Sequence, residues 1–229
     1  MNNIQLSSIP IDYSWSFSDK TVKDTSYITH GYYTYPAKFI PQLAERLIKE
    51  NSNEGDIVID PFMGSGTTID VAKELNRQVI GYDLNIVRSD VIQNDARKIP
   101  LENNNVDFVF IDSPYSDNIF YSDDPCCIGK ISCEKEEFFE ELEKVAKEMY
   151  RILKANKVIA WLIEDQWIKK KFTPVGFLLY QRLEKYFEPI DLICVTRHNQ
   201  TSNTGLWHNQ AKRFNFYLRG FKYLMVMKK

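Results

Sequence analysis

The residues best suited to chemistry begin in the stretch 57–68, which reads IVIDPFMGSGTT. A short apolar run ends at Asp60, and Gly64 and Gly66 follow before a helix-compatible stretch, so this order predicts a strand, a tight loop and a helix. A carboxylate beside a glycine loop repels phosphate and attracts a positively charged group. The pattern favours a ligand that joins a cation to an adenosine, such as S-adenosylmethionine.

Two common phosphate-binding loops are excluded by the residues around these glycines. A loop of the GxxxxGK[ST] type needs a lysine after its last glycine, but Gly66 is followed by Thr67 and Thr68. The dinucleotide pattern needs a third glycine where Ile69 stands. The remaining alternative is an ordinary strand-to-helix turn that needs glycine only for tightness.

Acidic residues also follow the next apolar runs. Asp83 ends the run 79–83, and Asp95 follows another short apolar segment. A carboxylate at the end of the second strand of a doubly wound sheet accepts hydrogen bonds from ribose hydroxyls. Asp95 could receive the adenine amino group. Acids at successive strand ends strengthen the prediction of an adenosine-containing ligand.

A fourth strand, 107–112, leads directly into Asp112-Ser113-Pro114-Tyr115. Together with residues 60–68, this tetrad resembles the DNA amino-methyltransferase family, whose signatures are a DPFxGSGTT loop and a DPPY tetrad. Residues 35–39, YPAKF, resemble the cofactor-methionine motif of that family. The resemblance covers about residues 30–165 and the terminal strands. It departs from the family pattern at Ser113, which replaces the first proline.

The resemblance implies a single-domain α/β fold, the Rossmann-like class I methyltransferase fold. Its sheet is expected to have seven mostly parallel strands with an antiparallel last strand. The methyltransferase domain should cover 30–229, after an N-terminal arm, 1–29, in which Trp15 and Phe17 could be anchors. The implied cofactor is S-adenosylmethionine. The residues implied to bind it are Tyr35, Pro36, Lys38, Asp60, Phe62, Gly64, Ser65, Gly66, Thr67, Asp83 and Asp95.

The tetrad suits methylation of an exocyclic amino group. The nitrogen is a poor nucleophile because its lone pair is delocalised into the base. The Asp112 carboxylate and the backbone carbonyl of Ser113 can accept the two amino hydrogens, while Tyr115 stacks on a base flipped out of the duplex. The catalytic residues are therefore expected to be Asp112, Ser113, Pro114 and Tyr115. Ser113 keeps the carbonyl but lacks the ring that stiffens the loop.

The charge of the chain is uneven. The net charge is −2, but residues 196–229 hold seven Lys or Arg and no acid, leaving 22 basic and 31 acidic residues before them. Aromatic residues lie among these charges, which suits a polyanion with stackable bases. We expect the loop 196–216 to contact the target. The expected nucleic-acid-binding residues are Arg197, Trp207, Lys212 and Arg213. The alternative is a solvated loop followed by a last strand.

Composition limits the remaining classes. With 229 residues, 44% of them hydrophobic, the chain can form one sizeable domain. No apolar run reaches membrane-spanning length and the N-terminus is polar, so we expect a cytoplasmic protein without membrane contact. Four cysteines do not make a disulfide framework in a chain of this length. The adjacent Cys126 and Cys127 lack CxxC spacing, so we expect no metal site, although zinc with His198 or His208 is conceivable.

The leading hypothesis is site-specific methylation of DNA within a restriction-modification context. Because Asp112 begins the tetrad, N6 of adenine is favoured over N4 of cytosine. An RNA base amino-methyltransferase would use the same pocket, whereas a protein glutamine methyltransferase would more typically begin its tetrad with Asn. A non-catalytic nucleic-acid-binding subunit is supported only by Ser113. Recognition of duplex DNA would come from loops, a homodimer or a partner recognition subunit.

Periodicity predicts the remaining elements. Helices are expected from Pro41, from about Glu134 and over 174–187, and strands over 158–163, 190–196 and 223–228. A turn is expected at 154–157 and a loop at 198–213. The lysine run 169–171 is expected on a solvated helix face.

Overall fold

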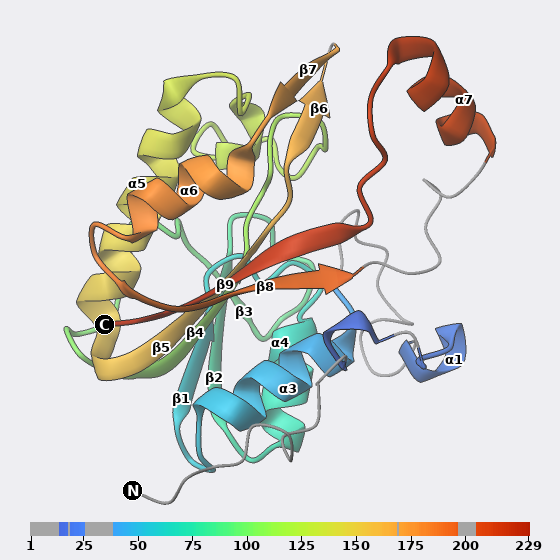
Figure 1. Ribbon diagram of the computed structural model, residues 1–229. Coiled ribbons are helices and arrows are strands. Elements are labelled where there is room, and N and C mark those ends of the chain that lie inside the picture. Colours follow the sequence, from blue (N-terminus) through green and yellow to red (C-terminus); the bar gives the residue numbers. More distant parts are fainter. Residues whose placement is uncertain (1–13, 18, 26–38, 169, 197–204) are drawn as a thin grey trace, which may run out of the picture.

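A seven-stranded sheet organises the computed structural model, which describes residues 14–17, 19–25, 39–168, 170–196 and 205–229 (Figure 1). The strand order is β3-β2-β1-β4-β5-β9-β8, and β9 runs antiparallel to both of its neighbours. This confirms the predicted α/β class and the antiparallel last strand. The strands are β1 (Ile57–Asp60), β2 (Gln78–Asp83), β3 (Val91–Gln93), β4 (Val106–Asp112), β5 (Leu153–Ile163), β8 (Glu188–Thr196) and β9 (Phe221–Lys228).

Helices cover both faces of this sheet (Figure 1). One face carries α3 (Pro41–Asn51) and α4 (Thr67–Glu74), and the other carries α5 (Glu136–Ile152) and α6 (Val175–Leu183). The side chains of β4 alternate between the two cores, with Phe108 and Phe110 in the α3 core and Val109 and Ile111 in the α5 core. A parallel strand buried on both faces needs such a continuous apolar run. This packing places the carboxyl ends of β1, β2 and β4 at one edge.

Two short helices near the N-terminus, η2 (Ser14–Ser16) and α1 (Val22–Thr25), precede the sheet. Phe17 is buried in the α3 core, and Trp15 packs against the same core. The Arg46 guanidinium lies 3.9 Å above the Trp15 ring. Both aromatic side chains therefore anchor this segment to the domain.

The structure corrects two local predictions in the C-terminal half. β5 begins at Leu153, directly after α5, so the expected turn at 154–157 is part of a strand. Its pairing with β4 shifts register between Val106 and Phe108, and Asn156 has a φ of +63°. The register shift lets the residues that were expected to form a turn remain part of the strand. Lys170 and Lys171, the described members of the lysine run, also lie outside any helix, because β6 (Gln166–Ile168) pairs antiparallel with β7 (Lys171–Thr173).

A helix replaces much of the loop expected at 198–213. This helix, α7 (Gly205–Phe214), contains neither proline nor a β-branched residue, and its only glycine stands at the first position rather than in the interior. None of its side chains is buried. Figure 1 shows α7 standing away from the sheet, beyond the start of β9. Helix α7 therefore projects from the domain as a structured element.

Candidate active site

A cavity opens at the carboxyl ends of β1, β2 and β4. Its walls come from the glycine loop, from the ends of β2 and β3, from the tetrad after β4, and from the polar loop that leads to η3 (Ile128–Lys130). This is where ligands bind in open α/β sheets. The lining residues include the expected residues Phe62, Gly64, Ser65, Thr67, Asp83, Asp95, Asp112, Ser113, Pro114 and Tyr115. The expected residues Tyr35, Pro36, Lys38 and Arg197 lie outside the described part of the chain.

The glycine loop turns on two residues with positive φ, Gly64 at +53° and Gly66 at +88°. The Gly64 N–H donates to the Asp83 carboxylate at 2.8 Å. Gly66 precedes the first residue of α4 and does not line the cavity. A Cβ at position 66 would lie 2.4 Å from the Arg88 guanidinium, and its backbone conformation would be strained. Gly66 therefore determines the backbone conformation of the loop without lining the cavity.

Asp60 also contacts the glycine loop and the start of α4 rather than the cavity. Its carboxylate accepts hydrogen bonds from the Phe62 N–H at 2.9 Å and the Thr68 hydroxyl at 2.7 Å, and the residue is 1% exposed. It does not line the cavity. Burial, followed by the nearby charges of Asp112 and Asp83, raises the pKa of Asp60 to about 7. Its position supports a role in holding the loop rather than in touching the ligand.

Arg88 helps to hold the glycine loop in place, and no sequence motif indicated this role. Its guanidinium donates to both oxygens of Asp70, at 3.0 and 2.9 Å, and to the carboxylate of Asp90. Longer contacts of 3.4 Å reach the carbonyls of Ser65 and Gly66. A planar guanidinium can serve several acceptors at once, so Arg88 ties the loop to α4.

Asp83 faces the cavity from the end of β2. One carboxylate oxygen accepts the Gly64 N–H and the other accepts the Asn85 N–H, at 2.8 and 2.9 Å. Each carboxylate oxygen keeps a second lone pair, so both can still accept a ribose hydroxyl. Burial raises the pKa of Asp83 above its ordinary value. The backbone amides thus fix an acceptor at the position predicted for the ribose.

Asp95 is held by a neighbouring arginine. The Arg97 guanidinium donates to both of its oxygens, and Arg97 also contacts Glu141 on α5. Burial acts to raise the pKa of Asp95, but the hydrogen bonds and charge of Arg97 outweigh it and lower that pKa. Asp95 therefore faces the cavity as a fixed carboxylate.

The tetrad is tightly connected. The Tyr115 hydroxyl donates to Asp112 Oδ1 at 2.5 Å, and Lys222 Nζ on β9 lies 3.8 Å from Asp112 Oδ2. Burial, and then the Asp112 charge, raise the pKa of Tyr115 well above its ordinary value of about 10, so the hydroxyl stays protonated. The Ser113 hydroxyl accepts the indole N–H of Trp161 on β5 at 3.0 Å. Neither Lys222 nor Trp161 was predicted, because both come from distant strands.

Other cavity residues were missed because their signal is ambiguous. Tyr121 and Cys127 belong to the polar loop after the tetrad. Phe39 also lines the cavity, but it is the last residue of the stretch 35–39 that the sequence already connected with the cofactor. A polar loop gives no pattern that separates a cavity wall from an exposed turn. Burial, followed by the charge of Asp112, raises the pKa of Tyr121, so this hydroxyl is also a neutral donor.

The cavity fits S-adenosylmethionine. The glycine loop supplies a backbone surface, Asp83 and Asp95 supply two acceptors, and Phe62, Met63 and Ile128 supply apolar walls. Positively charged side chains do not line the cavity in the described part of the chain, which suits a cationic sulfonium.

The described residues hold no group of three or more His, Cys, Asp or Glu side chains that could bind a metal ion. In the same part of the chain, the helices are too short or too polar to cross a membrane.

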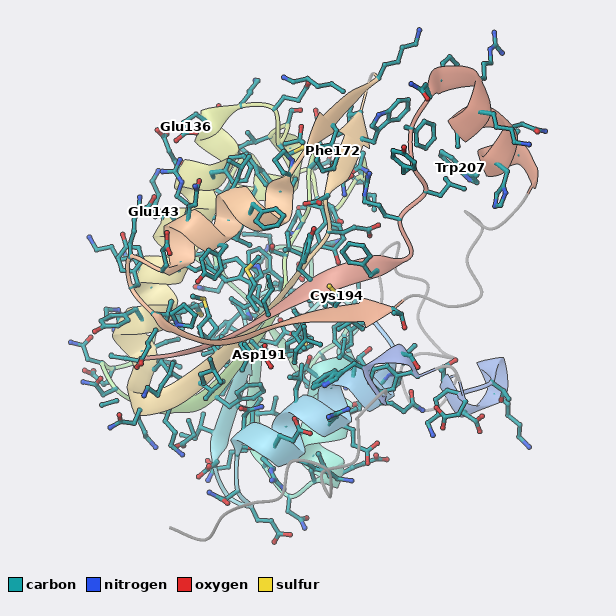
Figure 2. All side chains as sticks on the ribbon, in the orientation of Figure 1. Glu136, Glu143, Phe172, Asp191, Cys194 and Trp207 are labelled. Atoms are coloured by element: carbon teal, nitrogen blue, oxygen red, sulfur yellow. The ribbon has the colours of Figure 1, made fainter. Side chains whose placement is uncertain are left out.

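The described members of the expected nucleic-acid contacts lie apart from the cavity, on α7. Trp207 is 39% exposed, and Lys212 and Arg213 are exposed in the last turn of the helix. Figure 2 shows Trp207 on this projecting helix. The structure therefore presents three of the four expected contact residues on one element.

Comparison with known proteins decides the family. A profile of the DNA methylase family matches residues 6–94 and 106–229. The chain belongs to the DNA methylase family. It is 28% identical over 184 residues to the type II methyltransferase M.MjaII of Methanocaldococcus jannaschii, across 77% of this chain and 32% of that protein. It is 45% identical over 71 residues to the type II methyltransferase M.HpaI of Haemophilus parainfluenzae, across 31% of this chain and 21% of that protein. The chain thus spans at most about a third of these relatives.

Solved structures support the fold. TrmN from Thermus thermophilus has a TM-score of 0.56 at 18% identity, over 85% of this chain and 50% of that one. A geranyl diphosphate methyltransferase in complex with SAM has a TM-score of 0.52 at 14% identity, over 82% of this chain and 85% of that one. These likenesses confirm the Rossmann-like methyltransferase fold. The family and the lining of the cavity support S-adenosylmethionine as the cofactor.

Proposed function

We propose that this family member is an S-adenosylmethionine-dependent DNA methyltransferase that modifies an exocyclic amino group, with N6 of adenine favoured over N4 of cytosine. The observation that carries the proposal is the position of Asp112 and Tyr115 in the same cavity as the fixed acceptors Asp83 and Asp95. Asp83 and Asp95 suit the adenosine of the cofactor, and Asp112 and Tyr115 suit a base with an amino group. The matched family is described as DNA methylase, which supports DNA as the substrate.

The tetrad can make the amino nitrogen reactive. Bound S-adenosylmethionine supplies an electrophilic methyl group on a sulfonium. Asp112 and the carbonyl of Ser113 would each accept one amino hydrogen, which turns the nitrogen lone pair away from the ring. Asp112 and the Ser113 carbonyl would hold the nitrogen toward the methyl group as the N–C bond replaces the S–C bond. The thioether product of the cofactor would leave, and the methylated amine would release its extra proton to water. No strong general base is needed.

Tyr115 would act in two ways. Its ring offers a face on which a flipped base can stack, and its neutral hydroxyl donates to Asp112. The amino group must share or replace that hydrogen bond when the base enters. Preorganised acceptors of this kind cost little reorganisation during the reaction.

Target contact would come from the segment 196–216 of a methyltransferase domain that covers 30–229. In this segment Lys212 and Arg213 would neutralise phosphates, and Trp207 would stack on a base or fill the gap left by a flipped one. A homodimer or a partner recognition subunit would add contacts with duplex DNA.

The proposal is tested with S-adenosylmethionine that carries a labelled methyl group. The purified chain is incubated with duplex DNA, transfer RNA or ribosomal RNA, and the products are digested to nucleosides and identified by mass spectrometry. We expect N6-methyladenine in DNA, and no product with Asp112→Ala. Preferential label in RNA would overturn DNA as the substrate, and N4-methylcytosine would reverse the preferred base. Methylation-sensitive sequencing of DNA from expressing cells would then identify the target site.

A further inference from the structure

The hairpin β6–β7 adds a basic surface that lies close to α7. Residues 166–173 read QWIKKKFT, with three lysines and no acid. Lys170 and Lys171 are exposed, and Lys170 lies in the turn with a φ of +67°. The preceding acid Asp165 is 5% exposed, and its carboxylate accepts hydrogen bonds from the Gly176 N–H and the Tyr223 hydroxyl. Figure 1 shows the hairpin and α7 at the same end of the molecule.

Aromatic contacts join the hairpin to the segment that follows α7. The rings of Trp167 and Phe216 stack with centroids 4.0 Å apart and an interplanar angle of 26°. The Lys170 ammonium lies 5.1 Å above the ring of Phe214, the last residue of α7. These contacts join two regions separated by about forty residues in the sequence into one surface.

The joined surface is rich in cations and exposed rings. Phe172 is 48% exposed and Tyr217 is 90% exposed, and Figure 2 shows Phe172 on the hairpin. The Arg219 guanidinium lies 5.0 Å above the Phe172 ring. Lys171 makes a 3.5 Å contact with Glu134, but its side chain is 66% exposed, so solvent weakens this pair. Basic side chains interleaved with exposed aromatic rings suit a nucleic acid.

We propose that the described residues of the hairpin β6–β7 and the segment 205–219 form one surface that binds the phosphate backbone of duplex DNA. The inference rests on the proposed function and deepens it. The hairpin supplies Lys170 and Lys171, and α7 supplies Lys212 and Arg213. The hairpin contacts need no sequence information because phosphates occur at every step of the duplex.

The test compares duplex DNA affinity across a salt series. The variant Lys170→Ala/Lys171→Ala is matched with Lys144→Ala/Lys147→Ala, which removes two exposed lysines from α5. Two lost phosphate contacts should reduce the log–log salt slope by about 1.8. If the two proteins bind equally at 1 M salt, this difference in slope makes the variant bind DNA about 30-fold more weakly than wild type at 0.15 M salt. The control should keep the wild-type slope, and all variants should bind S-adenosylmethionine equally.

Each outcome has a defined meaning. If the hairpin variant matches the control variant while wild type binds and methylates DNA, the hairpin inference is wrong and the proposed function stands. If wild type modifies no DNA, the proposed function fails first. A duplex RNA competitor that binds equally and loses the same slope would overturn DNA as the partner of this surface.

A second observation concerns Lys222, near the start of β9. Its side chain is only 12% exposed, which is rare for lysine, and its ammonium lies 3.8 Å from Asp112 Oδ2. It also lies 5.0 Å from the centre of the Tyr115 ring. Since Tyr115 donates to the other oxygen of Asp112, the carboxylate is held from two sides.

We infer that Lys222 is a positioning residue that orients the Asp112 carboxylate toward the target amino group. This inference also depends on the proposed function, and it requires no contact between Lys222 and the base. Lys222→Met keeps most of the side-chain length and removes the charge. Because small displacements of a reacting group are costly, kcat should fall about 10- to 100-fold, with little change in the KM for DNA.

The matched control is Lys228→Met on the same strand, where Lys228 pairs with Glu188. Lys222→Arg should restore part of kcat, because it restores a charge beside Asp112. A Lys222→Met variant with the kcat of the control would overturn the inference. A raised KM and a flatter salt slope at unchanged kcat would also overturn it, by assigning Lys222 to a phosphate.

Discussion

Replacing Ser113 by proline gives the family tetrad but removes a buried hydrogen bond. The Ser113 hydroxyl accepts the Trp161 indole N–H at 3.0 Å, and the two residues are 2% and 0% exposed. A buried donor left without a partner costs about 1–3 kcal/mol. Proline recovers only about 0.4–1 kcal/mol by restricting the unfolded chain. Ser113→Pro should therefore lower the free energy of unfolding, although proline is the family residue.

A double-mutant cycle isolates this effect. Trp161→Phe removes the indole N–H and leaves a cavity. The cavity lowers the free energy of unfolding by the same amount whether residue 113 is serine or proline, so this loss cancels in the cycle. In the Trp161→Phe background, Ser113→Pro should be close to neutral. Ser113→Ala should behave like Ser113→Pro in the wild-type background, because it removes the acceptor without adding a ring. The expected coupling is about 1–3 kcal/mol.

Urea denaturation measures the four free energies of unfolding. Methyl transfer is assayed in parallel, and the double variant should keep turnover because the carbonyl of residue 113 remains. Additive free energies, with a coupling below about 0.5 kcal/mol, would refute the assignment of this hydrogen bond. A Ser113→Pro variant more stable than wild type would contradict it as well.

Three further predictions concern the cavity. Asp112→Ala should abolish methyl transfer and leave the calorimetric affinity for S-adenosylmethionine nearly unchanged. Tyr115→Phe should lose only part of kcat, because the stacking ring remains. Near-normal turnover in Asp112→Ala would contradict the mechanism. Asp83→Ala should weaken cofactor binding by about 1.5–3 kcal/mol, since a charged acceptor is lost, and unchanged calorimetry would remove Asp83 from the ribose site. The pKa of Asp60 is raised to about 7 in the folded state, so that state binds the proton more tightly, and the free energy of unfolding should fall as pH rises from about 4 to about 7. Asp60→Asn should flatten that fall in urea titrations, and an unchanged pH profile would refute the raised pKa.

The sequence determined the elements whose signals are local. The apolar runs of β1, β2 and β4 predict buried parallel strands, and the two glycines of the loop predict a tight turn. The tetrad and the acids Asp83 and Asp95 follow their strands directly, and the parallel sheet brings their positions to one edge. These parts could be predicted because each signal lies within a few residues of the group it positions.

Other features could be decided only by the tertiary structure. Asp60 follows the same strand-end pattern as Asp83, yet its carboxylate turns inward to Phe62 and Thr68. Nothing next to either residue in the sequence distinguishes these two directions, because the direction depends on which donors the folded loop presents.

The contacts of Trp161 and Lys222 depend on strand order. These residues lie 48 positions or more after the tetrad residues that they touch. Pairing of β5 with β4 places Trp161 beside Ser113, and the insertion of β9 next to β5 brings Lys222 toward Asp112. The hairpin and α7 likewise become neighbours through the stacking of Trp167 on Phe216. Periodicity describes which face of an element is buried, but the partner of that face is chosen by packing across the whole sheet.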